Sequence, residues 1–328
     1  MTGTVLTIVL NWRTAAMSLQ AAEAALREMA GIPGALVLVD NASGDGSFER
    51  MSAEVAARGW DAGPHRVRVI QSGRNGGFGA GNNVGIRAGL PGDERPDFVY
   101  ILNSDAFPDA GAIAALRDHL LAHPDVGLAG SYIHGPDGAP HQTAFRFPSI
   151  AGELEGAIRL GPVTRLLRRH VVPLPVPQAT CRVDWLAGAS VMIRRDVLDR
   201  IGLFDETFFL YFEEVDLCRR AALAGWPTVY VRESAVTHIG SVSTGMKTWA
   251  RVPGFWFDSR LHYFTKQHGP AYALGATLAH VAGGAVWRLR CALTGRTTGE
   301  PPGALRDLIR HHLTHLRAPA ARRPRPQP

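Results

Sequence analysis

The segment Phe98-Val99-Tyr100-Ile101-Leu102-Asn103-Ser104-Asp105 is an uncharged apolar run that ends in three polar residues. Five consecutive large apolar residues predict a short strand that is buried on both faces. The segment Ala110–His123, which follows, is expected to form a helix. A buried strand, a polar turn and a helix in this order are typical of a sheet built from strand–helix units.

The same order of elements occurs three times before this segment. Buried strands are expected at Thr4–Leu10, Ala35–Val39 and Arg66–Gln71, and helices at Ala15–Met29, Phe48–Arg58 and Asn82–Leu90. Strands that alternate with helices predict the α/β fold class, with a mostly parallel sheet and helices on both faces. Ligands of such sheets bind beyond the carboxyl ends of the strands. Asp40 and Asp105 each lie directly beyond such an end, which indicates a functional site.

The remainder of the chain is less regular. Between Ser131 and Gln178 it is richer in proline, and beyond His238 the alternation of strands and helices ends. Further elements are expected at Val183–Ile193 (a strand), Asp196–Ile201 (a helix) and Pro227–Val231 (a strand). The end of the chain, residues 317–328, is rich in proline and arginine and is expected to be disordered.

The basic charge of the chain is concentrated near its C-terminus. The sequence pI is about 9.6, but from Arg288 onwards nine arginines stand against only Glu300 and Asp307. The rest of the chain is therefore close to neutral. A nucleic-acid-binding protein is expected to carry its basic residues on the folded body, so this class of function is disfavoured.

Cysteine usage and hydropathy indicate where the chain resides. Cys181, Cys218 and Cys291 are odd in number, widely spaced and in no metal-ligand pattern, which is typical of free thiols in a reducing compartment. The apolar run Val5–Leu10 is too short for a signal-peptide core, and no run of apolar residues is long enough to predict a membrane-spanning helix. We expect a cytoplasmic protein.

An aromatic run leads directly into three acids in Phe208-Phe209-Leu210-Tyr211-Phe212-Glu213-Glu214-Val215-Asp216. Large apolar residues lie inside proteins, where an unpaired carboxylate is costly and its pKa rises. The acids therefore mark a helix start, a reaction site, or both. Acids favour the first turn of a helix, and Asp216 can pair with Arg219 or Arg220. This interpretation leaves the two glutamates unexplained, so a catalytic carboxylate stays open.

A glycine-rich segment, Gly76-Gly77-Phe78-Gly79-Ala80-Gly81-Asn82-Asn83, partly matches a dinucleotide-binding fingerprint. Its spacing is wrong, because Asn82 stands where the third glycine is required, and it follows the third strand rather than the first. A glycine-rich turn entering a helix can still bind phosphate or ribose through backbone N–H groups. A plain loop before a helix is the alternative.

Two further positions have the chemistry of metal ligands. Asp105, with Asn103 two residues before it, offers the oxygen ligands that Mg²⁺ or Mn²⁺ shares with substrate phosphates. Its alternative role is that of a helix N-cap or turn residue. His238 follows a strand and precedes a glycine. It is either structural or completes the coordination of an ion such as Mn²⁺.

The order of these motifs resembles that of one protein family. Asp40 after the second strand, the Arg-Asn-Gly-Gly-Phe-Gly-Ala-Gly-Asn-Asn and Leu-Asn-Ser-Asp segments, the aromatic-acidic run and His-Ile-Gly-Ser occur in turn over about residues 4–245. The chain resembles a family 2 glycosyltransferase of the GT-A fold. It is most similar to the bacterial rhamnosyltransferase-like branch, which builds cell-envelope glycans.

This resemblance assigns roles to individual residues. It implies that Asp105 and His238 bind Mg²⁺ or Mn²⁺, and that Glu214 is the general base. Glu213 is a rival for that role, because this chain has Glu where the family has Asp. A nucleotide-sugar site is implied at Asp40, Asn41, Asn75, Gly76, Gly77, Gly79, Asn82, Asn103, Ser104 and Asp105. As a separate hypothesis, acceptor-binding residues are expected at Trp185, Gly188 and Tyr211, with a packing role in the core as the alternative for Trp185.

The resemblance also implies a reaction and its partners. A sugar is expected to pass with inversion from a dTDP, UDP or GDP sugar to a hydroxyl of a glycan or a polyprenyl-linked acceptor. The competing hypotheses are a non-catalytic nucleotide-sugar-binding protein and a NAD-dependent oxidoreductase. Leu166 and Leu167 among Arg165, Arg168 and Arg169, the nearly uncharged Ala271–Trp287 stretch and the basic tail predict peripheral contact with the cytoplasmic face of the inner membrane.

These features divide the chain into three regions. A GT-A catalytic domain is expected at 1–245, with a nucleotide-sugar half at about 1–130 and an acceptor half at about 131–245. A helical, membrane-proximal region follows at 246–316, and a disordered basic tail at 317–328.

Overall fold

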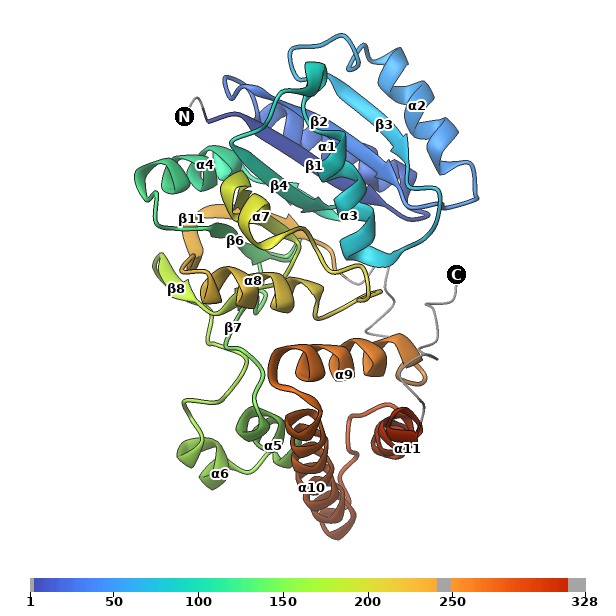
Figure 1. Ribbon diagram of the computed structural model, residues 1–328, viewed down its shortest axis with the longest axis vertical. Helices are drawn as coiled ribbons and strands as arrows, with labels where there is room; N and C mark the ends of the chain where they lie inside the picture. Colours follow the sequence, from blue (N-terminus) through green and yellow to red (C-terminus); the bar gives the residue numbers. More distant parts are fainter. Residues whose placement is uncertain (1–2, 241–248, 318–328) are drawn as a thin grey trace.

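The computed structural model describes residues 3–240 and 249–317. Within these residues the chain forms an α/β body around a nine-stranded sheet, with a group of helices at one end of the body (Figure 1). The strand order is β3 (Val67–Gln71), β2 (Gly34–Asp40), β1 (Val5–Asn11), β4 (Phe98–Asn103), β10 (Ser190–Arg194), β6 (Leu128–His134), β11 (Thr228–His238) and β5 (Ala106–Pro108), with β8 (Cys181–Val183) paired to β11.

The first four strands are parallel and lie at the predicted places. Their side chains are apolar towards both faces of the sheet, so helices must cover both faces. Helices α1 (Ala15–Glu28), α2 (Ser47–Ala57) and α4 (Ala112–Ala122) pack on one face. Helices α3 (Gly77–Ala88), α7 (Arg195–Ile201) and α8 (Glu213–Leu223) pack on the other. The predicted α/β fold class is confirmed.

The second half of the sheet brings β11 to the functional edge. Strand β10 lies antiparallel between β4 and β6, and β11 runs parallel to β6. The short strand β5, which follows β4 directly, pairs antiparallel with the end of β11. In this register His238 is opposite Ala106. The end of β11 therefore lies beside the polar residues that follow β4.

The glycine-rich segment differs from the prediction. Helix α3 begins at Gly77, inside the segment expected to be a loop, and not at Asn82. Gly77 has a left-handed φ of +85°, and a Cβ there would lie 1.6 Å from the carbonyl oxygen of Phe209. A Cβ on Gly79 would lie 2.9 Å from the Cβ of Phe204. The glycines thus let the start of α3 approach the segment before α8.

Two strand predictions are also corrected. The expected strand Val183–Ile193 is divided into β8, β9 (Trp185–Leu186) and β10, and β9 pairs with β7 (Ala144–Phe145) in a separate ribbon. The strand expected at Pro227–Val231 continues to His238, with an irregularity between Val231 and Ala235. A period-two pattern does not reveal this extension, because the irregularity interrupts it. A single 3₁₀ turn, η1 (Pro91–Asp93), precedes β4.

The helical group combines two parts of the chain. The expected C-terminal helices α9 (Gly254–His268), α10 (Pro270–Thr294) and α11 (Ala304–Arg317) are joined by α5 (Ile150–Ile158) and α6 (Gly161–Leu166). Helices α5 and α10 approach closely, since a Cβ on Gly283 would lie 2.9 Å from the carbonyl oxygen of Leu154. The buried Arg260 of α9 donates to Glu153 of α5 at 2.8 Å. The division at residue 245 stays a prediction, and residues 318–328 lie outside the described part of the chain.

One face of α10 is apolar and exposed. Leu278, Leu289 and Leu293 are 59%, 61% and 78% exposed, and Leu274 and Val286 lie on the same side. In the described residues, no helix combines the length and the hydropathy that crossing a membrane requires.

Candidate active site

Asp105 and His238 meet at the edge of the sheet. His238 Nε2 lies 3.1 Å from Asp105 Oδ1, and the N–H of Gly240 donates to Asp105 Oδ2 at 3.1 Å. The Asn103 amide nitrogen is 3.5 Å from His238 Nε2. Asp105 is buried and does not cap α4, whose N-cap residue is Gly111. The fold therefore brings together the three residues that were candidate metal ligands.

The ligand atoms of Asp105 and His238 suit a divalent cation. A carboxylate oxygen and an imidazole nitrogen 3.1 Å apart are at the separation of two ligands on one ion. The ring centre of His141 lies 6.2 Å from that of His238, and the planes of the two rings are inclined by 70°. Sequence reasoning missed His141, because it stands in an irregular segment with no motif around it.

Asp40 is held in place by neighbours at the ends of β1 and β2. Its buried carboxylate accepts from Asn11 Nδ2 at 2.7 Å and from Ser43 Oγ at 2.6 Å, and its second oxygen accepts from the Ser43 N–H at 3.1 Å. Asn11 and Ser43 were missed. A signal existed for Asn11, which follows the first strand as Asp40 follows the second.

A chain of hydrogen bonds joins Asp40 to the residues after β4. Thr14 Oγ1 contacts both Asn11 Oδ1 and Ser104 Oγ, each at 3.3 Å. Asn11 in turn donates to Asp40. The ends of β1, β2 and β4 thus form one polar surface, as expected from the carboxyl ends of parallel strands.

Asn41 and Asn75 connect this surface to the start of α3. Asn41 Nδ2 donates to Asn75 Oδ1 at 3.0 Å and to the Gly77 carbonyl at 3.1 Å. Among the described residues, Asn41 Oδ1 and Asn82 Oδ1 are buried without a hydrogen-bond partner. Buried polar atoms are normally paired, so these two acceptors mark a place where a ligand can bind.

The first backbone N–H groups of α3 are already engaged. Gly77 N donates to Asn75 Oδ1 at 3.1 Å, and Phe78 N donates to the Phe209 carbonyl at 3.0 Å. A Cβ on Gly76 would lie 2.7 Å from the Cβ of Ala80. Close packing therefore accounts for glycine at positions 76, 77 and 79. Phosphate binding by the N–H groups of Gly77 and Phe78 is not needed to explain these glycines.

The aromatic-acidic run is both a helix start and an unusual acidic site. Helix α8 begins at Glu213, after Tyr211 and Phe212, whose φ angles are +68° and +69°. Two consecutive aromatic residues in the left-handed region are strained. The backbone is held there from outside, because Gly77 and Phe78 pack against Phe209.

Glu213 and Glu214 are acids with raised pKa values. Burial, and then the neighbouring Glu214 carboxylate, raises the pKa of Glu213 well above its ordinary value. Burial raises the pKa of Glu214 to about 7. Within the described residues, Oε2 of each glutamate has no hydrogen-bond partner. The Glu214 carboxyl group is therefore able to take up or release a proton near neutral pH.

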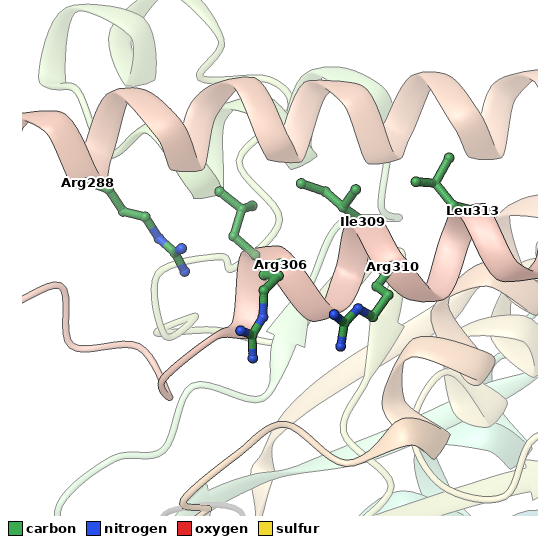
Figure 2. A pocket seen from close by; sticks show the side chains of 6 residues that line it. Arg288, Arg306, Ile309, Arg310 and Leu313 are labelled. Carbon is green, nitrogen blue, oxygen red and sulfur yellow. The ribbon is translucent and has the colours of Figure 1, made fainter.

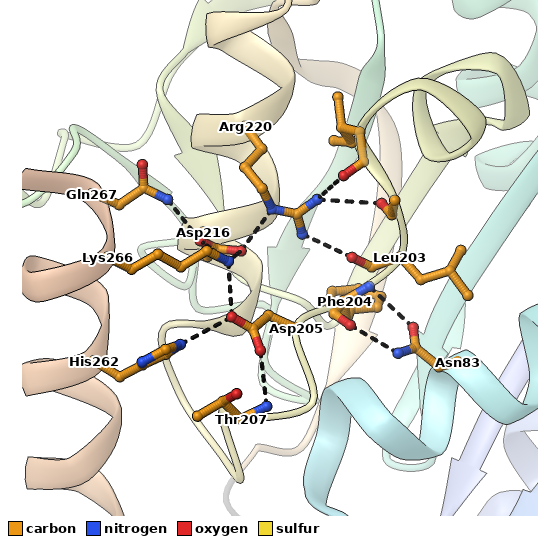
Figure 3. Close-up of polar contacts among 12 residues, drawn as sticks. Asn83, Leu203, Phe204, Asp205, Thr207, Asp216, Arg220, His262, Lys266 and Gln267 are labelled. Carbon is orange, nitrogen blue, oxygen red and sulfur yellow. Dashed lines mark hydrogen bonds and ion pairs between the residues drawn. The ribbon is translucent and has the colours of Figure 1, made fainter. Parts of the chain in front are cut away.

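Asp216, the third acid, is structural. It is fully buried and accepts from Arg220 Nε at 2.8 Å, Lys266 Nζ at 2.9 Å and Gln267 Nε2 at 2.6 Å (Figure 3). The predicted pairing with Arg220 is confirmed. Arg219 instead lies over the ring of Phe147. Asp216 thus ties α8 to α9, which supports the neighbouring glutamates.

A second set of hydrogen bonds, which the sequence did not predict, holds the loop before α8 in place. Asn83 exchanges two hydrogen bonds with the backbone of Phe204, and Asp205 accepts from His262 and Lys266 of α9 (Figure 3). Burial acts to raise the pKa of Asp205, but the hydrogen bonds from His262 and Lys266 outweigh it and lower that pKa.

The three predicted acceptor residues lie on different elements. Trp185 stacks on Phe145 at 4.1 Å and donates its indole N–H to the Arg146 carbonyl at 2.9 Å. A Cβ on Gly188 would lie 3.1 Å from Phe78 Cζ, so Gly188 borders the start of α3. Tyr211 packs edge-on against Trp249. Their acceptor role stays a prediction.

A family model described as "Glycosyltransferase like family 2" matches residues 4–252, well over half of the chain. The chain belongs to glycosyltransferase family 2. This membership excludes the NAD-dependent oxidoreductase as an interpretation of the glycine-rich segment.

Curated relatives of this glycosyltransferase include rhamnosyltransferases. It is 32% identical over 226 residues to the N-acetylglucosaminyl-diphospho-decaprenol L-rhamnosyltransferase of Mycobacterium tuberculosis, covering 65% of this chain and 69% of that protein. It is 28% identical over 165 residues to a rhamnosyltransferase of Escherichia coli K12, covering 47% of this chain and 58% of that protein. The predicted resemblance to the rhamnosyltransferase-like branch is confirmed.

The fold of this glycosyltransferase is shared with solved enzymes. A mannosyltransferase from Pyrobaculum calidifontis, solved in complex with GDP-Man and Mn²⁺, superposes with a TM-score of 0.53 at 14% identity, covering 94% of this chain and 86% of that one. At this identity the likeness concerns the fold alone. The predicted GT-A fold is confirmed.

Proposed function

We propose that this glycosyltransferase transfers a sugar, with rhamnose as the first candidate, from a nucleoside-diphosphate sugar to a hydroxyl of a glycan or polyprenyl-linked acceptor in cell-envelope polysaccharide synthesis. The observation that carries this proposal is the pair of glutamates with raised pKa values at the start of α8, in a fold whose sheet brings Asp105 to His238. The decaprenol-linked substrate named for the mycobacterial relative supports the acceptor class.

Asp105 and His238 are the proposed ligands of Mg²⁺ or Mn²⁺. When bound, such an ion supplies positive charge that neutralises the departing diphosphate. Asp105 is oriented by the Gly240 N–H, which leaves its other oxygen directed at His238. Asn103 lies beside both and is proposed to contact the donor or a water molecule. The residues present therefore fit a divalent cation.

Glu214 is the proposed general base. The acceptor hydroxyl must lose its proton as it attacks the anomeric carbon, and a carboxylate with a pKa of about 7 is well matched to accept it. Burial and the Glu214 carboxylate also raise the pKa of Glu213, which stays the rival candidate for the base. Direct displacement by the hydroxyl inverts the anomeric centre and needs no second nucleophile.

The donor base is proposed to bind between β2 and the start of α3. Asn41 at the end of β2 donates to Asn75 and to the Gly77 carbonyl there, and Asn41 Oδ1 and Asn82 Oδ1 have no partner within the described residues. These acceptors suit the N–H groups of a nucleobase. Asp40, the neighbour of Asn41 in the chain, is included in the proposed site. The choice among dTDP, UDP and GDP is left to the experiment, since all three bases present N–H donors.

The turnover of donor sugars tests this proposal directly. dTDP-, UDP- and GDP-sugars are assayed with a polyprenyl-diphospho-N-acetylglucosamine acceptor and Mn²⁺ or Mg²⁺, and the anomeric configuration of the product is determined. We expect one donor to be turned over with inversion. Glu214→Gln should lose most of this activity, whereas Glu54→Gln on α2 should keep it. A protein that binds donors but turns over none of them would instead be the non-catalytic nucleotide-sugar-binding protein.

We further propose that the helical group contacts an anionic lipid surface at the cytoplasmic face of the inner membrane. The exposed leucines of α10 end near a groove between α10 and α11 that Arg288, Arg306 and Arg310 line (Figure 2). Ile309 and Leu313 point from α11 towards α10 (Figure 2). Apolar surface beside arginines suits anionic headgroups, and each cation contributes about 1 kcal/mol near the surface.

Helix α6 adds to the same end of the molecule. Leu166 is 82% exposed and stands beside the exposed Arg165, Arg168 and Arg169, and α6 lies with the far end of α10 away from the sheet (Figure 1). The charge is complementary to an anionic surface, which favours lipid over a neutral protein partner.

Cosedimentation with vesicles tests the membrane proposal. Vesicles containing phosphatidylglycerol should bind the protein at low salt, and phosphatidylcholine vesicles should bind it at least about tenfold less. Leu289→Glu with Leu293→Glu should abolish binding. Leu223→Glu is the matched control, because Leu223 is an equally exposed leucine on the α/β body. Equal binding by both variants would contradict the proposal.

A further inference from the structure

Three potential metal ligands converge between two C-terminal helices, away from the site described above. Asp258 stands on α9, and His311 and His315 stand one turn apart on α11. His311 Nε2 lies 2.7 Å from Asp258 Oδ1, and His315 Nε2 lies 3.5 Å from the same oxygen. One ligand atom from each residue lies within 4.8 Å of the other two. Helices α9 and α11 lie side by side in Figure 1.

The orientation of His315 fixes which of its nitrogens faces Asp258. Its Nδ1 lies 2.9 Å from the backbone carbonyl of His311, and a carbonyl can only accept, so Nδ1 carries the proton. Nε2 then faces Asp258, and in the neutral imidazole it carries the lone pair. Histidines that bind metals are commonly oriented in this way, with one nitrogen donating to a carbonyl and the other binding the ion.

The spacing of the three atoms matches a small ligand cage. An ion at about 2.0–2.2 Å from each ligand, in tetrahedral geometry, requires ligand atoms roughly 3.3 Å apart. The two distances to Asp258 Oδ1 lie on either side of this value. Two residues four apart on a helix present their side chains to the same face, which is the arrangement that His311 and His315 need.

A simple ion pair explains this arrangement less well. The Asp258 side chain is 49% exposed, and an exposed pair of this kind contributes little to stability. Two imidazoles nevertheless direct Nε2 at one carboxylate oxygen, and their ring centres are only 4.0 Å apart. A shared cation would use both imidazoles and the carboxylate oxygen at once.

We propose that Asp258, His311 and His315 bind one divalent transition-metal ion of the Zn²⁺ type, with water in the fourth position. Two imidazole nitrogens and one carboxylate oxygen are the ligands that Zn²⁺, Co²⁺ and Ni²⁺ favour over Mg²⁺. This site is separate from the Mg²⁺ or Mn²⁺ ligands proposed at Asp105 and His238, and it does not depend on the proposed function.

The ion would fasten α11 to the helix that supports the acidic segment. Ser259, next to Asp258, donates to the Leu210 carbonyl at 3.0 Å, and Lys266 of the same helix holds Asp216. The start of α11 is already tied by Arg251, which donates twice to Asp307. The proposed ion adds a second tie one to two turns further along α11.

Metal titration of the full chain tests the site. Protein freed of metal with a chelator is titrated with Zn²⁺ by calorimetry and with Co²⁺ by visible absorption, in an Asp105→Asn background so that the other proposed metal site does not contribute. We expect one equivalent of Zn²⁺ to bind, a tetrahedral Co²⁺ spectrum, and a melting temperature that rises with Zn²⁺ concentration. Asp258→Asn should weaken Zn²⁺ binding at least about tenfold.

The chain offers a matched control. His119 and His123 of α4 form another pair four residues apart, with ring centres 4.2 Å apart, but among the described residues no third ligand joins them. Replacing His311 and His315 with alanine should abolish the Zn²⁺ signal, while replacing His119 and His123 should leave it intact. Circular dichroism in the absence of metal confirms that each variant is folded. No Zn²⁺ binding by the parent, or unchanged binding after loss of His311 and His315, would overturn the proposal.

Discussion

His238 Nε2 lies 3.1 Å from Asp105 Oδ1, although 133 residues separate them in the chain. The contact follows from the sheet, since β5 turns back after Asp105 and pairs with the end of β11. The Ile239 N–H also donates to the Asp105 carbonyl at 3.1 Å. The backbone, rather than a flexible loop, therefore places the two side chains together.

Replacing His238 should raise the metal requirement of the enzyme. His238→Ala removes one proposed ligand, so we expect the Mn²⁺ concentration for half-maximal activity to rise about 10- to 100-fold, by analogy with the loss of other groups around metal sites. His134→Ala is the control, because His134 pairs with Asp109 at 2.8 Å on the adjacent strand in the same kind of contact. A similar rise in both variants would argue against a specific role for His238.

Replacing Glu214 should slow the chemical step and change its pH dependence. A general base contributes about 10²–10⁴-fold, so Glu214→Gln should lower kcat by that factor and leave donor binding intact. In the wild type, kcat/KM should rise with pH up to about 7, as the carboxyl group with the pKa of about 7 loses its proton. The rise should vanish in the variant. If Glu213→Gln produces these effects instead, the assignment of the two glutamates is reversed.

Stability should also depend on the two glutamates. Their raised pKa values mean that the folded chain retains protons that the unfolded chain releases above the ordinary pKa of 4.5. The free energy of unfolding must therefore fall as the pH rises from 4.5 through about 7, by at most about 1.4 kcal/mol per pH unit for each group. Glu213→Gln should flatten this fall. Urea unfolding between about pH 5 and 8, with Glu54→Gln as the control, measures the difference; parallel curves would contradict it.

Gly77 should be far less replaceable than its neighbour Gly73. Both have left-handed φ angles, +85° and +78°, but only Gly77 lacks room for a Cβ, which would meet the Phe209 carbonyl oxygen at 1.6 Å. Gly73→Ala should cost about 1–2 kcal/mol, the usual penalty for that conformation. Gly77→Ala should cost more and displace the segment that carries Glu213 and Glu214. Urea unfolding and activity compare the two, and equal losses would count against close packing at Gly77.

Much of the α/β body could be predicted from the sequence, because its strands are short, uncharged runs and its helices follow with clear periodicity. The start of α3 could not, because the glycines there suit a loop locally, and the distant Phe209 and Phe204 explain Gly77 and Gly79 only once the chain is folded. The extension of β11 to His238 was hidden by the irregularity after Val231.

The candidate site likewise contains residues that the sequence predicts and residues that it does not. Asp40, Asp105 and the glutamates stand out because acids follow apolar runs, and the resemblance of the motifs supplied their roles. Asn11 and Ser43 orient Asp40 through contacts that no local pattern reveals. The close packing of α5 on α10 depends on small residues such as Gly283. The need for a glycine at this position is visible only when the two helices are adjacent.

The most direct test of the central claim is thermal unfolding of the wild type and of Asp105→Asn with dTDP, UDP or GDP, each with and without Mn²⁺. We predict that one nucleoside diphosphate raises the melting temperature of the wild type only when Mn²⁺ is present, and that Asp105→Asn loses this rise. Stabilisation that is independent of Mn²⁺, or that persists in Asp105→Asn, would contradict a metal-assisted glycosyltransferase built on Asp105 and His238.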